Sequence, residues 1–130
     1  MLAKKQLDEL KEHLEKAQNP IFYYDNDADG LCSFLILRRA FGKGYGVAVR
    51  SYPSLDGSYA RKAKELGADY VFVLDKPVIS PEFLKEIDEM QLPLVWADHH
   101  KQEEKVFVGL VSFPCFQICI LVQFKENQEE

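Results

Sequence analysis

The chain has 130 residues, of which 47% are hydrophobic and 28% are charged, a composition typical of one soluble globular domain with a single core. The net charge of −5 argues against non-specific binding of duplex nucleic acid through a general basic surface, but it does not exclude a small phosphorylated substrate or a metal-bridged one. Three cysteines without a CxxC pair, and no charged-then-apolar leader, favour a reducing, cytoplasmic location.

The first half of the chain predicts two helices that alternate with two strands. Apolar residues from Leu2 to Ala17 recur at three- and four-residue steps, which is typical of an amphipathic helix. Asn19-Pro20 then ends that helix. The expected elements are a helix over 1–18, a strand over 21–24, a helix over 31–41, a turn over 42–46 and a strand over 47–51.

The second half repeats the alternation. The run YVFVL at 70–74 is continuously apolar, as expected for a strand that is covered on both faces. Ser80-Pro81 has the order of a helix N-cap followed by proline. We expect a helix over 56–66, a strand over 70–74, a helix over 80–90 and a strand over 92–97. The alternation predicts an α/β fold with an open, mainly parallel sheet flanked by helices.

The last part of the chain differs in composition. Val106–Phe124 contains no charged residue, and a membrane helix needs roughly that length. Pro114 lies near the middle of this stretch and three polar residues interrupt it. We therefore expect two short buried strands, or one strand and an apolar tail, and no membrane span. We expect Glu126–Glu130 to form an acidic, frayed end.

Side chains of the types that bind metals follow three of the predicted strands. Open α/β sheets place ligand sites at the carboxyl ends of their strands, so these side chains are expected to gather at one edge. Carboxylates with imidazole suit a divalent ion such as Mn²⁺, and several carboxylates could hold two ions that activate water and orient a phosphoryl group. The residues are Asp25 and Asp27 after the first strand, Asp75 after the third, and Asp98, His99 and His100 after the fourth.

Each of these residues also has a purely structural interpretation. An aspartate at a strand end is commonly a turn former or a helix cap. Asp75 precedes Lys76-Pro77 and could be a turn residue, and the two histidines could belong to a surface loop. Asp29 could either cap the helix that follows or support the metal ligands. The joint placement at the ends of three strands favours the metal interpretation.

Three segments together resemble a known family. YYDNDADG (23–30), VFVLDKP (71–77) and WADHH (96–100) are similar in order and context to the first three motifs of the DHH phosphoesterases, most of all the RecJ-like branch, over residues 20–101. The resemblance implies a Rossmann-like DHH domain with a two-metal centre, generally Mn²⁺, with Mg²⁺ possible. It also implies hydrolysis of phosphodiester bonds in single-stranded nucleic acid or small nucleotides.

Carried over by position, the resemblance assigns a role to each residue. Asp25, Asp27 and His99 would be metal ligands, and Asp75 would bridge two ions. Asp98 and His100 would act in catalysis, by orienting the ligands or by contacting the substrate phosphate.

The sequence also departs from the family pattern. The family has a fourth motif with another aspartate and a smaller C-terminal substrate-binding domain, whereas this chain has no aspartate after Asp98. We expect a helix at 1–19, a DHH-type catalytic domain at 20–105, and an apolar then acidic tail at 106–130 that is atypical or truncated. A chain of this kind would be a fragment, or would need a partner chain.

Two other functions compete with the phosphoesterase. One is a truncated, non-catalytic relative that binds metal or a protein partner, with Val106–Phe124 as the interface. The other is a receiver-like signalling domain, which also gathers acidic residues at strand ends but gives His99 and His100 no role.

Overall fold

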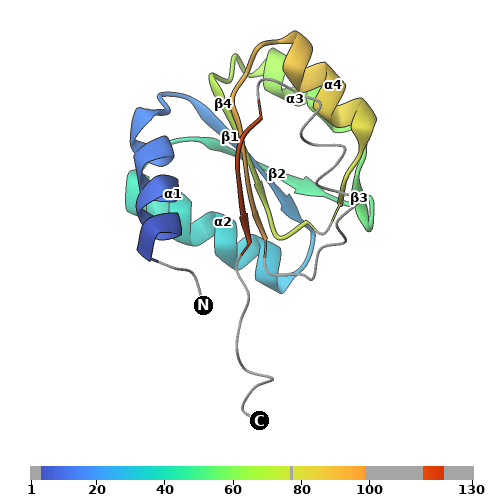
Figure 1. The fold of residues 1–130 in the computed structure, drawn as a ribbon. Helices are drawn as coiled ribbons and strands as arrows, with labels where there is room; N and C mark the ends of the chain where they lie inside the picture. The colour runs from blue at the N-terminus through green and yellow to red at the C-terminus, as the bar shows by residue number, and fades with distance from the viewer. Residues whose placement is uncertain (1–3, 77, 99–115, 122–130) are drawn as a thin grey trace.

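The structure is a computed structural model that describes residues 4–76, 78–98 and 116–121 (Figure 1). Helices and strands alternate along most of the chain. The elements are α1 (Lys4–Lys16), β1 (Pro20–Asp25), α2 (Ala28–Phe41), β2 (Tyr45–Val49), β3 (Ser54–Leu55), the 3₁₀ helix η1 (Gly57–Tyr59), α3 (Ala60–Glu65), β4 (Tyr70–Leu74), β5 (Val78–Ile79), α4 (Pro81–Glu89), β6 (Leu94–Asp98) and β7 (Phe116–Leu121).

The main sheet has five strands in the order β2-β1-β4-β6-β7. Every neighbouring pair is parallel, and the pair β3-β5 forms a separate small parallel sheet. The prediction of an α/β fold with an open parallel sheet flanked by helices is therefore confirmed. Parallel strands need long crossover connections, which the intervening helices supply.

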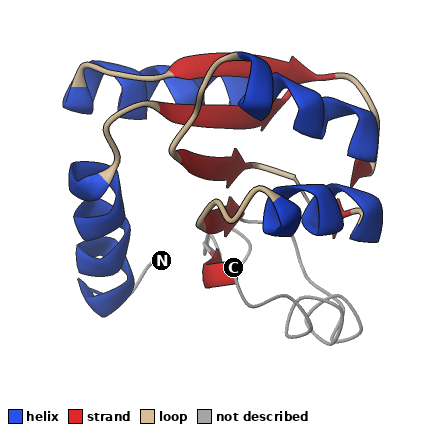
Figure 2. Cartoon of the chain, turned by 90° about the horizontal axis from the view of Figure 1, so that it is seen from above, coloured by secondary structure: helices blue, strands red, loops and turns tan. Residues whose placement is uncertain are grey.

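Alternate residues of the strands pack on opposite faces of the sheet. Phe22, Phe72 and Val95 are in register and belong to a core cluster that also takes in Leu14 of α1 and part of α2. One position further along, Tyr23, Val73 and Trp96 are in register and share a second cluster with residues of α3 and α4. The helices thus divide between the two faces, α1 and α2 on one and α3 and α4 on the other (Figure 1). In Figure 2, α1 is the helix at the left, beside the N label.

The helix after β1 begins and ends at residues whose chemistry explains its bounds. Asp27 is the N-cap, and its carboxylate accepts a hydrogen bond from the Gly30 N–H at 2.8 Å. Gly42 adopts a left-handed φ of 68° and donates its N–H to the Arg38 carbonyl oxygen, the usual way in which glycine ends a helix. The helix begins at Ala28 rather than Leu31, and β2 begins at Tyr45 rather than Val47.

Two further differences concern short elements. The helix expected over 56–66 is a 3₁₀ turn followed by α3, and the paired strands β3 and β5 are only two residues long each, too short to leave a periodic pattern. Within Val106–Phe124 the structure describes Phe116–Leu121, a strand parallel to β6. The rest of that stretch lies outside the described residues. Among the helices that are described, none is long and apolar enough to cross a membrane.

Candidate metal centre

The carboxyl ends of β1 and β4 meet at the point where the strand order of the sheet reverses. From β1 the chain crosses to β2 on one side, and after β2 it returns to β4 on the other side of β1. In open α/β sheets ligands bind outside the carboxyl ends of the strands at such a reversal. Asp25 is the last residue of β1, and Asp75 directly follows β4.

Three carboxylates come together at this edge. Asp25, Asp27 and Asp75 each offer an oxygen, and these oxygens all lie within 4.8 Å of one another. Asp25 and Asp75 are buried, whereas Asp27 is exposed. The structure thus brings together three of the four predicted metal ligands, from two strands that are far apart in the sequence.

The donor set fits a hard divalent cation. Carboxylate oxygens are the ligands preferred by Mg²⁺ and Mn²⁺. Two oxygens on opposite sides of one octahedral ion lie roughly 4.2 Å apart when each is about 2.1 Å from the ion. At most one of the three pairs can lie on opposite sides, and adjacent oxygens lie roughly 3.0 Å apart, so carboxylates that now lie within 4.8 Å of one another would move closer by up to about 2 Å around one ion. Buried carboxylates at such spacing repel one another, and a bound cation relieves that repulsion.

Asp75 has an uncommon backbone conformation. Its φ is 60°, in the left-handed region that few residues other than glycine, asparagine and aspartate occupy. Its N–H donates to the Ala97 carbonyl oxygen at 3.0 Å, so pairing with β6 continues past the end of β4. The chain turns at Asp75 while that carboxylate stays buried beside Asp25.

Gly30 allows α2 to begin directly against the end of β1. A Cβ at this position would lie 2.0 Å from the Asp25 carbonyl oxygen, far inside van der Waals contact. Any side chain would therefore push the first turn of α2 away from β1 and displace Asp27 relative to Asp25. Glycine in DADG is a packing requirement of the acidic cluster.

Asp29 does not have the capping role that was one of its two expected roles. The cap of α2 is Asp27, because its carboxylate stands one residue ahead of the helix and reaches the Gly30 N–H. Asp29 lies in the first turn and is exposed. Support of the metal ligands by Asp29 stays a prediction.

Lys76 is a buried residue beside the acidic cluster that sequence reasoning missed. It is fully buried, and its ammonium lies 3.0 Å from Asp25 Oδ1 and also donates to the Ser51 carbonyl oxygen. Its own carbonyl oxygen accepts from Trp96 Nε1 at 2.8 Å. Lysine is rarely buried without a partner, so its burial could not be expected from its residue type. Its position directly after Asp75 was the one hint that it lies beside the acidic cluster. The charges of the three clustered carboxylates and the Lys76 ammonium sum to −2, which one divalent cation would neutralise.

A pocket of about 450 Å³ opens beside the acidic cluster, a size suited to a small ligand. It lies where β1 and β2 end. Its lining residues are Asp25, Asn26, Asp27, Val49, Arg50 and Tyr52.

The third predicted motif is only partly described. β6 ends at Asp98 and pairs with β4 in parallel, so the backbone of Asp98 reaches the same edge of the sheet as Asp75. The side chain of Asp98, and both His99 and His100, lie outside the described residues. Their roles stay predictions.

Comparison with solved structures finds a related fold. RecJ from Thermus thermophilus in complex with Mn²⁺ superposes with a TM-score of 0.57 at 22% sequence identity, covering 77% of this chain and 15% of the RecJ chain. An ABC transporter permease from the Pseudomonas fluorescens group superposes with a TM-score of 0.44 at 15% identity, covering 62% of this chain and 21% of the permease. This second likeness is too weak to support an argument. No protein-family model and no curated protein matches the sequence. The likeness to RecJ is one of fold.

Proposed function

We propose that this chain contains a DHH-type phosphoesterase domain that depends on a divalent cation and hydrolyses phosphodiester bonds in single-stranded nucleic acid or small nucleotides. The convergence of Asp25, Asp27 and Asp75 at the switch point of a parallel sheet carries this proposal. The motifs around them resemble those of DHH phosphoesterases. The crystal structure of RecJ, which has a similar fold, was determined in complex with Mn²⁺.

Asp25, Asp27 and Asp75 would hold the cation, with His99 as a further ligand and Asp75 shared with a second ion. Mn²⁺ or Mg²⁺ bound there would neutralise phosphate charge and promote ionisation of the attacking water. Asp27 is oriented by its hydrogen bond from Gly30, and Asp25 by its ion pair with Lys76. Asp98 and His100 would orient the ligands or contact the substrate phosphate.

The remaining assignments belong to the same proposal. The catalytic unit would span 20–105, after the helical segment 1–19, and the protein would act in the cytoplasm. The chain spans 15% of RecJ, so binding of a long substrate would draw on surfaces beyond this unit. Val106–Phe124 is proposed as a contact for a protein partner.

Hydrolysis of a short single-stranded oligonucleotide and of a model phosphodiester, with Mn²⁺ and with EDTA, tests the proposal. In Asp75→Asn the side chain keeps its size, and asparagine also tolerates a positive φ. The substitution removes the negative charge. We expect kcat/KM to fall more than about 100-fold in this variant, because losing a ligand should cost more than losing a residue that merely supports one. Asp56→Asn is the matched control, because the Asp56 carboxylate caps η1 and lies outside the acidic cluster. Hydrolysis that persists in EDTA or in Asp75→Asn would refute the proposal.

A non-catalytic binding module is the second candidate function. It is favoured by the ion pair between Lys76 and Asp25, because that pair leaves carboxylate charge for one divalent cation rather than for the two ions of the phosphoesterase proposal. Such a module would bind Mn²⁺ or a partner without turnover. Intact Mn²⁺ binding together with no hydrolysis of either substrate would select this candidate over the phosphoesterase.

A further inference from the structure

The pocket beside the acidic cluster has two chemically different sides. Asp25 and Asp27 form the acidic side, whereas Arg50 and Tyr52 come from the end of β2 and the loop that follows it. Among the described residues that line the pocket, Arg50 carries the positive charge. A ligand that combines a phosphate with an aromatic group matches this division.

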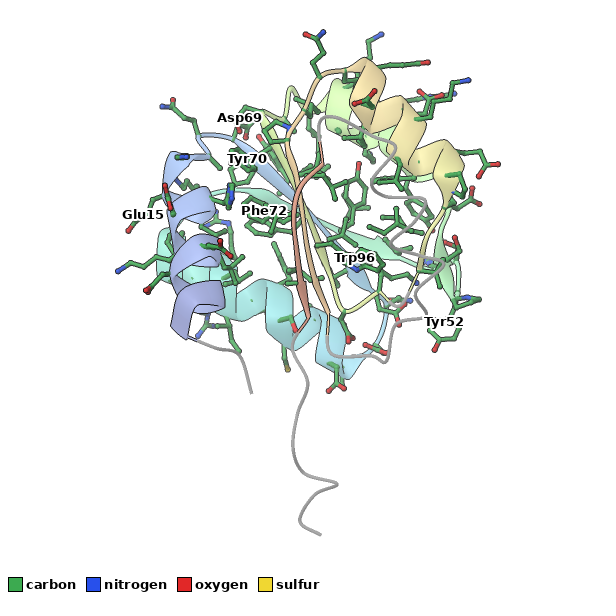
Figure 3. All side chains as sticks on the ribbon, in the orientation of Figure 1. Glu15, Tyr52, Asp69, Tyr70, Phe72 and Trp96 are labelled. Carbon is green, nitrogen blue, oxygen red and sulfur yellow. The ribbon has the colours of Figure 1, made fainter. Side chains whose placement is uncertain are left out.

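Tyr52 is a large aromatic residue that the core does not use. It is 66% exposed and lies at the periphery of the molecule in Figure 3. The Lys76 ammonium lies 5.1 Å from the centroid of its ring, close enough for a cation–π interaction. Because Lys76 is fully buried, it approaches the ring from the protein side. The exposed part of the ring faces the solvent, and Tyr52 is one of the residues that line the pocket.

The loop that carries Tyr52 is held at several points. The Ser51 carbonyl oxygen accepts from Lys76, and the Ser51 hydroxyl donates to the Ser54 carbonyl oxygen at 2.7 Å. The pairing of β3 with β5 then ties the loop to the segment after β4. A loop whose backbone is held before binding loses little conformational freedom when a ligand stacks on the ring that it carries.

Arg50 is anchored through its backbone while its side chain is exposed. Its N–H donates to the Tyr59 hydroxyl at 3.0 Å, and Tyr23 in turn donates its hydroxyl hydrogen to the Tyr59 carbonyl oxygen at 2.8 Å. Burial raises the pKa of Tyr23, so this hydroxyl keeps its proton for the bond. The guanidinium is thus presented from a fixed strand end, and guanidinium groups bind phosphate oxygens in a bidentate manner.

We propose that Tyr52 and Arg50 form the nucleotide-recognition side of this pocket, with the Tyr52 ring stacked on a nucleobase and the Arg50 guanidinium on a phosphate. The inference rests on the proposed function for the choice of a nucleotide as the ligand. It adds a preference for substrates that bear a base over sugar phosphates that lack one. The volume of about 450 Å³ falls within the range of small-ligand sites.

Binding of AMP and of ribose 5-phosphate, measured by isothermal titration calorimetry with Mn²⁺ present, tests this inference, because both probes carry the ribose and the phosphate and only AMP carries a base. Loss of one stacked aromatic residue weakens binding roughly 10- to 100-fold. We expect the wild-type chain to prefer AMP by at least about 10-fold, and Tyr52→Ala to lose that preference. Tyr52→Phe should keep it. Arg50→Gln should weaken both ligands by a similar factor.

Tyr45→Ala is the matched control, because Tyr45 is also an exposed tyrosine but lies at the opposite end of β2; it should bind both probes like the wild type. A wild-type chain without preference for AMP, or a Tyr52→Ala variant that keeps the preference, would overturn the inference. Oligonucleotide hydrolysis measured on the same preparations separates the two claims. Hydrolysis without a preference for AMP refutes only the recognition role, whereas a preference without hydrolysis supports that role and refutes only the proposed catalysis.

Discussion

Replacing Lys76 by methionine removes a positive charge from inside the protein and keeps most of the side-chain volume. The Lys76 ammonium is fully buried, 3.0 Å from a carboxylate oxygen of Asp25 whose side chain is only 10% exposed. At that distance the attraction is about 5.5 kcal/mol with an effective dielectric constant of about 20. Removing one partner of a buried pair leaves the other charge uncompensated, so we expect a loss of roughly 3–5 kcal/mol in the free energy of unfolding.

Urea unfolding in EDTA, followed by circular dichroism, measures this loss. Lys64→Met is the matched control, since Lys64 is an exposed lysine of α3 and the same change there should stay within about 0.5 kcal/mol of the wild type. A Lys76→Met variant that unfolds within about 1 kcal/mol of the control would refute the argument, because buried pairs broken on one side cost more than that.

Addition of Mn²⁺ extends the same experiment. An ion bound at Asp25 supplies the charge that Lys76→Met lacks, so Mn²⁺ should stabilise this variant more than it stabilises the wild type. Stabilisation of the wild type alone would contradict this charge argument and would mean that the ion needs the Lys76 ion pair to position Asp25.

Three other perturbations test the packing around the site and the attachment of α1. Gly30→Ala should cost at least about 1–3 kcal/mol of unfolding free energy by overpacking and should also weaken Mn²⁺ binding, because its Cβ would lie 2.0 Å from the Asp25 carbonyl oxygen; unchanged stability would contradict this. Burial, and then the charge of Lys16, lower the pKa of His13 below 6.5, so the stability from neutral His13 is complete above pH 6.5 and is lost as the pH falls through the folded-state pKa. His13→Asn should flatten this dependence in thermal melts from pH 7.5 to 5, and an unaltered slope would count against it. Asp69→Ala removes two 2.8 Å hydrogen bonds that backbone N–H groups after α1 donate to the Asp69 carboxylate. We expect the free energy of unfolding in urea to fall by about 1.5–3 kcal/mol. A change below about 0.5 kcal/mol, the range of ordinary surface substitutions, would show that the turn does not depend on Asp69.

The strand-end residues were predictable because they depend on a simple rule of parallel sheets. The apolar runs before Asp25 and Asp75 marked two strands, and ligand sites gather at the carboxyl ends of such strands. The sequence alone was therefore enough to assign both carboxylates to one edge, since that assignment needs no knowledge of side-chain conformation.

Other features depend on tertiary contacts that leave no periodic signal. The burial of Lys76 depends on its contacts with Asp25 and with the Ser51 carbonyl oxygen, and only its place directly after Asp75 distinguishes it in the sequence from an exposed lysine. Gly30 resembles an ordinary helix start until the approach of Asp25 is known. Asp27 rather than Asp29 caps α2, because the helix begins at Ala28, before its run of apolar residues starts.

Calorimetric titration with Mn²⁺ tests the central claim, that three carboxylates from two distant segments form one cation site, most directly. The wild-type chain and Asp56→Asn should bind with the same affinity. Asp75→Asn should bind more than about 100-fold more weakly, because it loses a ligand rather than a supporting residue. Wild-type affinity in Asp75→Asn, or no binding by the wild-type chain, would contradict the account.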